Sequence, residues 1–114
     1  MSRDVRLYLT DMLTCCNKVL SYTAGSSQSE FVANEMAYDA TIRNLEVIGE
    51  AAKHVPDEVR SQIEDVEWRQ ITGFRDILAH AYFGLDNDII WDVIQRHVPR
   101  LRRALAEYLT QPSP

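Results

Sequence analysis

The chain has 114 residues, of which 46% are apolar and 25% are charged. This balance is typical of a folded, water-soluble domain and excludes a disordered or low-complexity chain. The length predicts one domain over residues 1–114. No apolar run is long enough for a membrane-spanning helix, and the N-terminus lacks the layout of a signal peptide. We therefore expect a cytoplasmic protein that contacts no membrane.

The net charge of −5 argues against a nucleic-acid binder of the basic-patch type. The charge is uneven, because residues 1–67 carry 6 basic and 12 acidic side chains, whereas residues 68–114 carry 6 and 5. Arginines gather in the second half, at Arg96, Arg100, Arg102 and Arg103. They either guide a polyanion locally or complement the negative end of the last helix.

Apolar residues recur at three- and four-residue steps through nearly the whole chain, which predicts an all-α antiparallel helical bundle of about five helices. The expected helices cover about residues 3–23, 27–54, 57–63, 68–82 and 87–110, and residues 111–114 are expected to be disordered. Ser27 and Glu30 have the spacing of a capping box, and Asn34 is a position at which the second helix could be interrupted. Pro56 suits the first turn of the third helix, whereas Pro99 predicts a kink in the last.

Two short stretches bear on packing and assembly. Cys15 and Cys16 are adjacent in an apolar run, so they predict buried small hydrophobes and neither a disulfide framework nor a zinc site. The small residues around Gly49 allow a close approach of backbones in the second helix. A homodimer would bury this surface, which is the interpretation we favour, but a contact between helices of one chain would bury it as well.

The segment from Gly73 to Gly84 gathers an arginine, a carboxylate, a histidine and a phenol at the end of a predicted helix. Arg75 can bind phosphate oxygens as a bidentate fork, and His80 can exchange a proton near neutral pH. Tyr82 can donate a hydrogen bond, stack on a base or act as a nucleophile. Asp76 lies four residues before His80, where it either orients the imidazole or makes an ordinary surface contact, the latter being favoured by spacing alone.

Helical geometry limits how these residues can cooperate. On an unbroken helix Arg75 and His80 lie about 140° apart, so they do not share a face. Three solutions remain open: the helix deforms near Ala79, the long arginine side chain curls round, or a second copy of the motif across a dimer completes the site.

The spacing Arg75-x4-His80-x-Tyr82 resembles the R-x4-H-x-Y motif of the HepT-like toxins, a branch of the HEPN superfamily of all-helical proteins. The segment from Arg43 to Lys53, RNLEVIGEAAK, resembles a second block of that family, and the stretches after Tyr82 and around Pro99 are similar as well. The resemblance covers the chain from Arg3 to about Leu109. R-x4-H alone is weak evidence, but the two blocks at this separation are specific.

The resemblance implies a metal-independent ribonuclease of a toxin–antitoxin pair, a homodimer whose two motifs line one cleft. Arg75 and His80 match the catalytic residues, and Asp76 matches a supporting polar residue. Tyr82 matches the tyrosine to which a partner antitoxin, a minimal nucleotidyltransferase, transfers AMP. No cofactor or metal is implied. Arg96 and Arg100 are possible RNA contacts, and the acidic first half is a surface that a basic antitoxin could bind.

From these residues we expect RNA cleavage through the 2′-hydroxyl, with His80 as acid or base and Arg75 stabilising charge on phosphorus. The alternative is a non-catalytic binding partner that presents a pocket to its nucleotidyltransferase. The other histidines have simpler interpretations: His54 suits the negative end of a helix, and His97 belongs to a core or interface. Trp68 and Trp91 are predicted to be packing residues, and the polar stripe of Arg43, Glu46 and Glu50 is solvated or lines an interface.

Overall fold

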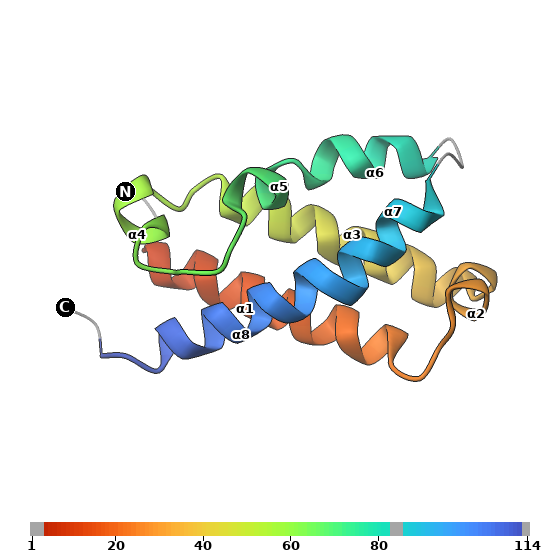
Figure 1. The fold of residues 1–114 in the computed structure, drawn as a ribbon, viewed down its shortest axis with the longest axis horizontal. Helices are drawn as coiled ribbons and strands as arrows, with labels where there is room; N and C mark the ends of the chain where they lie inside the picture. The colour runs from red at the N-terminus through yellow and green to blue at the C-terminus, as the bar shows by residue number, and fades with distance from the viewer. Residues whose placement is uncertain (1–3, 83–85, 113–114) are drawn as a thin grey trace.

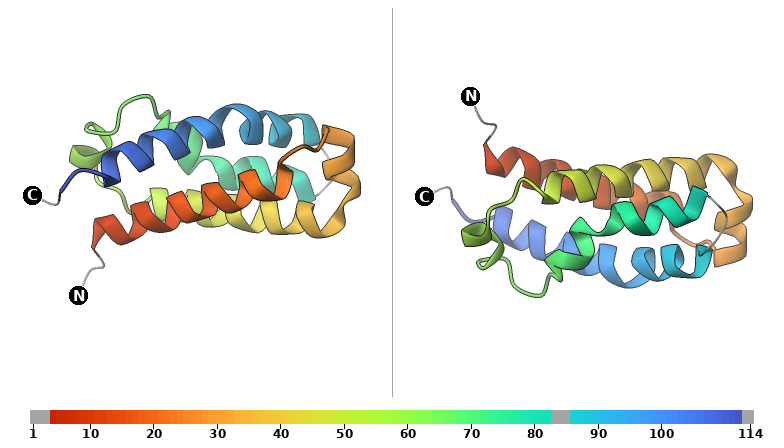
Figure 2. Two further views of the ribbon diagram at one scale, coloured as in Figure 1. Left: turned by 90° about the horizontal axis from the view of Figure 1, so that it is seen from below. Right: turned by 90° about the horizontal axis from the view of Figure 1, so that it is seen from above.

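Two long antiparallel helices, α1 (Val5–Thr23) and α3 (Glu35–Ala52), form one side of the molecule (Figure 1). The structure is a computed structural model that describes residues 4–82 and 86–112, except for the side chains of residues 80–82. Helix α6 (Phe74–Tyr82) and the continuous run α7 (Asn87–Asp92), η1 (Val93–His97) and α8 (Val98–Leu109) complete a bundle of alternating direction (Figure 2). Short helices α2 (Gln28–Ala33), α4 (Asp57–Arg60) and α5 (Trp68–Thr72) join these elements. The prediction of an all-α helical bundle is confirmed.

The α2–α3 corner follows from local hydrogen bonding. The capping box at the start of α2 is formed as predicted, since the Ser27 hydroxyl accepts from the backbone N–H of Glu30 and the Glu30 carboxylate accepts from that of Ser27. Asn34 does interrupt the predicted helix, because it adopts an extended conformation and its side chain accepts from the N–H of Ala37 at 3.1 Å. One residue therefore ends α2 and caps α3.

The predicted helix over residues 68–82 is divided into α5 and α6 at Gly73. A Cβ atom on Gly73 would lie 3.1 Å from the carbonyl oxygen of Arg69, so this tight junction favours glycine. The third predicted helix is also shorter than expected. Pro56 is its N-cap rather than part of its first turn, and α4 ends at Arg60, not Ile63.

The irregularity predicted at Pro99 takes the form of a π-helical turn. Proline has no N–H to donate and its ring crowds the preceding turn, so an α-helical ladder cannot run through it undisturbed. Here the N–H of Val98 bonds to the carbonyl of Val93, five residues earlier, and α8 starts directly afterwards. The extra residue in this turn lets the last two helices continue in one direction across the proline.

The core lies where α1, α3 and α8 pack together, and it continues under α6 and α7. Its fully buried side chains include Leu9, Met12, Leu45, Ile48, Phe74, Ile94, Leu101 and Leu105. Cys15 and Cys16 are buried here as predicted, and burial raises the pKa of the Cys16 thiol to about 12. Within residues 4–82 and 86–112, no helix is long and apolar enough to cross a membrane.

Candidate active site

Helix α6 presents one buried and one exposed face. Phe74 and Leu78, four residues apart, are 1% and 2% exposed and anchor the helix on the core. Arg75, Asp76 and Ala79 lie on the outer side and are exposed. The apolar anchors therefore fix α6 in place while the motif's first charged residues face solvent.

The contact between α3 and the α5–α6 junction depends on Gly49. A Cβ atom on Gly49 would lie 3.4 Å from both the Ile71 carbonyl oxygen and the Phe74 Cβ, so the two segments touch at backbone distance. The small residues around Gly49 are thus buried within one chain, which is the second of the two interpretations left open by the sequence. This stretch no longer supports a dimer.

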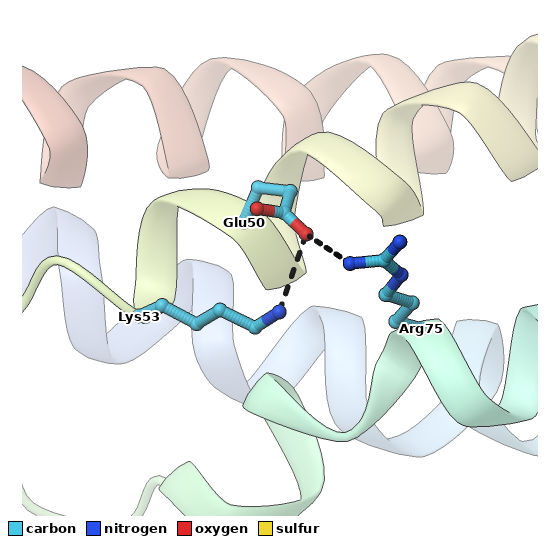
Figure 3. A network of polar contacts seen from close by, with 3 residues as sticks. All are labelled: Glu50, Lys53 and Arg75. Carbon is cyan, nitrogen blue, oxygen red and sulfur yellow. Dashed lines mark hydrogen bonds and ion pairs between the residues drawn. The ribbon is translucent and has the colours of Figure 1, made fainter.

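An ion-pair network joins the two helices across this contact (Figure 3). The Glu50 carboxylate on α3 lies 3.8 Å from the Arg75 guanidinium and 3.3 Å from the Lys53 ammonium. The Arg75 side chain is 77% exposed, so water screens this contact and it stabilises the fold only weakly. The guanidinium is therefore directed by Glu50 but stays accessible to an incoming anion.

Arg75 lies at a hollow of about 490 Å³ between α3 and α6, lined by Glu46, Glu50, Arg75, Leu78 and Ala79. Its walls combine apolar surface from α6 with carboxylates from α3. A second hollow of about 330 Å³ lies between α1 and α3, and Glu46 and Glu50 line it too. The two hollows thus flank α3, with Glu46 and Glu50 between them and Arg75 on the α6 side.

His54 and Tyr8 also line the second hollow. Their rings are stacked, with centroids 4.5 Å apart and planes 7° from parallel. His54 follows the C-terminus of α3, as the sequence predicted, but its ring contact is with Tyr8 of α1. The imidazole is exposed, whereas the phenol is half-buried.

The backbones of His80 and Tyr82 belong to α6, which is helical from Phe74 to Tyr82. Their side chains lie outside the described part of the structure, and so does any pairing of Asp76 with His80. Because the helix is continuous through position 80, a deformation near Ala79 does not bring Arg75 and His80 onto one face. Two of the three solutions stay open: a curled arginine and a second copy of the motif.

Arg96 and Arg100 line neither of the two hollows along α3. Arg96 lies 3.4 Å from the Asp92 carboxylate one turn earlier. Arg100 lines a separate hollow of about 320 Å³ beside Asp65 and Tyr108. Any RNA contact by these arginines would extend the site rather than form its centre.

The two tryptophans have packing roles, and the described side chains offer no cluster that could bind a metal ion. Trp91 lies with its ring centroid 5.5 Å from that of Phe31, and the Arg60 guanidinium lies 5.4 Å from the ring centroid of Trp68. His97 is half-buried. Among the side chains that the structure describes, no three His, Cys, Asp or Glu residues gather closely enough to hold a metal ion.

Comparison with known proteins gives the family. The model of the family described as "Ribonuclease HepT-like" matches residues 12–108, which include both α3 and α6. The chain belongs to the HepT-like ribonuclease family.

Three relatives of this HepT-like chain match it over most of their own length. "Putative RNase MJ1380" of Methanocaldococcus jannaschii is 37% identical over 101 residues, covering 89% of this chain and 93% of the relative. "Putative RNase TTE0752" of Caldanaerobacter subterraneus subsp. tengcongensis is 38% identical over 91% of this chain and 93% of its own. "Probable ribonuclease HepT" of Thermococcus cleftensis is 31% identical over 90% and 93%. No solved structure shows a significant match.

Sequence reasoning about this HepT-like chain missed two features of the site. From the sequence, Tyr8 is only a residue of the first predicted helix, and Glu50 only a member of a polar stripe. Both come close to residues far away in the sequence, namely His54 and Arg75. No local signal could have found these pairs, because helical periodicity reports which face a residue lies on and not which helix packs against that face.

Proposed function

We propose that this chain is a metal-independent endoribonuclease and the toxin of a toxin–antitoxin pair. The observation that carries the proposal is the exposed Arg75 guanidinium, set at a hollow on the same helix as His80 and Tyr82. A guanidinium held there can bind both non-bridging oxygens of a phosphodiester. Membership of a ribonuclease family supports RNA as the source of that phosphodiester.

The chemistry is an in-line attack of the RNA's own 2′-oxygen on the adjacent phosphorus. A base takes the proton of the 2′-hydroxyl, the bond to the 5′-oxygen of the next nucleotide breaks, and an acid returns a proton to that oxygen. His80 serves as base or acid, while Arg75 stabilises the charge on the pentavalent phosphorus. Asp76 supports His80 by orienting its imidazole. The products are a 2′,3′-cyclic phosphate and a 5′-hydroxyl.

A homodimer completes the site in this proposal. On continuous α6 the positions of Arg75 and His80 lie about 140° apart around the helix axis, so one helix does not direct both side chains at the same phosphate. Two copies of the helix that face one another can do so. Arginine from one protomer and histidine from the other can then approach the same phosphate, and Arg96 and Arg100 extend the surface that binds RNA.

Regulation is proposed to act at Tyr82, two positions after His80. A partner nucleotidyltransferase would transfer AMP from ATP to the phenol oxygen and release pyrophosphate. An adenylate at this position would add a bulky anion two residues after His80, and it would block RNA by size and by charge.

The direct test is cleavage of labelled single-stranded RNA by purified protein in excess EDTA. We expect full activity with cyclic-phosphate ends, and loss of activity in H80A. Dependence on added divalent metal, or an active H80A protein, would contradict the mechanism. Induced expression separates the alternative: growth arrest that H80A abolishes supports a toxin, whereas harmless wild-type protein supports a non-catalytic partner.

Modification is tested by intact mass after incubation with ATP and a purified minimal nucleotidyltransferase. We expect AMP adducts on the wild-type protein and none on Y82F. Adducts that persist on Y82F, or no adducts at all, would contradict the role of Tyr82.

A further inference from the structure

The hollow between α1 and α3 has no role in the proposed cleavage step, although it adjoins the Arg75 hollow. Glu46 and Glu50 line both, and Glu50 also contacts Arg75. A ligand anchored at Arg75 can therefore reach the Tyr8–His54 ring pair by passing over the Glu46 and Glu50 side chains of α3, which lie between the two hollows.

The ring pair has the form of a stacking platform. The rings of Tyr8 and His54 are nearly parallel and 4.5 Å apart between centroids. Packing of α1 against the end of α3 accounts for the partial burial of Tyr8, but it leaves the imidazole of His54 open to solvent. A further flat ring can extend such a stack, and every nucleobase offers a π-face for this purpose.

Each hollow holds one guanidinium among carboxylates. In the hollow between α3 and α6, Arg75 lies beside Glu46 and Glu50 and can bind a phosphate. In the hollow beside the ring pair, Arg43 lies among Asp11, Glu46 and Glu50. This second hollow is therefore acidic overall, which disfavours a phosphate there and favours the amino group of a base.

We propose that Tyr8 and His54 form a base-binding subsite that takes one unpaired nucleobase of an RNA whose phosphate is held by Arg75. The subsite rests on the proposed ribonuclease function for its ligand. It selects single-stranded RNA, because a base within a duplex is already stacked and cannot reach the platform.

The first test is binding of a short fluorescent single strand of 2′-O-methyl RNA, which the protein cannot cleave through the 2′-oxygen. Y8L and H54A should each weaken the affinity roughly tenfold by anisotropy, since each removes one ring of the stack. Y8F, which keeps the ring, should bind as the wild type does. Tyr22 is an exposed tyrosine of the same helix that lines neither hollow, so Y22L is the matched control and should bind normally.

The second test uses the wild-type protein and avoids any folding defect of a variant. In NMR spectra, assigned with H54Q, titration with the same RNA should move the His54 ring protons upfield because a base stacks on the imidazole. If His80 resonances move and those of His54 do not, the subsite is wrong while RNA binding at α6 stands. If His54 responds but RNA is never cleaved, the subsite stands and the ribonuclease proposal fails.

A second copy of the chain is the competing occupant of this face. If Y8L or H54A turns a dimer into a monomer by light scattering, and RNA affinity changes only through that dissociation, the ring pair belongs to an interface and the base-binding proposal is overturned.

Discussion

Where α1, α3 and α8 meet, the side chains are apolar and almost wholly buried, whereas the outer side of α6 carries charged side chains that solvent reaches. Leu45 of α3 is 1% exposed, but the side chain of Arg75 is 77% exposed. The first region stabilises the fold through close packing, and its residues have no chemistry to offer. The second contributes little to stability beyond its two anchors, Phe74 and Leu78. Stability and chemistry are thus carried by different faces, and substitutions should separate them.

The largest effect is expected at Arg75. R75A should reduce RNA cleavage about 1000-fold, because one preorganised cation is lost from the transition state, while the melting temperature stays nearly unchanged. R75K should be almost as poor, since an ammonium cannot form the bidentate fork. Arg69 is an exposed arginine of α5 outside both hollows, so R69A is the control and should cleave normally. A large loss of stability in R75A would contradict the separation of the two faces.

The reverse result is expected for the core. L45A should lower the free energy of unfolding by about 3 kcal/mol, through lost burial and the cavity left behind, as measured by urea denaturation. The protein that remains folded should cleave RNA at the normal rate per folded molecule. A specific loss of activity at full folding would show that the core also tunes the site.

Gly49 lies where α3 of the core touches the start of α6, so substitutions at Gly49 test how far activity depends on this contact. The added Cβ of G49A would lie 3.4 Å from the Ile71 carbonyl oxygen and the Phe74 Cβ, which is an ordinary van der Waals contact. Because the better helix propensity of alanine offsets the tighter contact, the free energy of unfolding should be nearly unchanged and the rate of RNA cleavage should stay within about twofold. G49L should push α6 away from α3, lowering stability by about 2 kcal/mol and activity at least tenfold. Urea denaturation and RNA cleavage assays would measure both quantities, and equal behaviour of the two variants would show that the close approach is unimportant.

A smaller effect is expected from the arginines of the last helices. The double variant R96A/R100A should weaken RNA binding only a few-fold and flatten its salt dependence, because each removes at most one phosphate contact. Titration at several salt concentrations measures this slope. The rate at saturating RNA should be unchanged, and a lower saturating rate would place these arginines in the reaction itself.

The smallest effect is expected at the α2 capping box, remote from both hollows. S27A should cost about 1 kcal/mol of stability at neutral pH. The hydrogen bond from the Ser27 N–H lowers the pKa of Glu30, so the contribution of its carboxylate is complete above the ordinary value of 4.5 and is lost as pH falls through the lowered pKa. E30Q should therefore be less stable than wild type at pH 7 and equal to it at low pH. Urea denaturation at both pH values measures the difference in stability between E30Q and the wild type. If E30Q is still the less stable protein at low pH, the ionised carboxylate of Glu30 is not the cause.

Local rules account for much of the fold. The apolar period predicts α1, α3 and α8, and the side chains of Ser27 and Glu30 predict the start of α2, because both signals depend only on neighbours within about one turn. The same rules place Arg75, His80 and Tyr82 on one helix end. They also overrun at Gly73, where α5 ends and α6 begins at a tight junction that favours glycine and that periodicity does not register.

The sequence by itself determined the helical class, the burial of Cys15 and Cys16, and the motif that leads to the HepT-like family. Each of these depends only on the spacing of residues that are close together in the sequence. Only the tertiary structure decided that Gly49 packs against α5 and α6 within one chain, that Glu50 faces Arg75, and that Tyr8 stacks on His54. These contacts join residues from different helices, and their geometry depends on how the helices pack against one another. The spacing of residues along each helix does not contain that information.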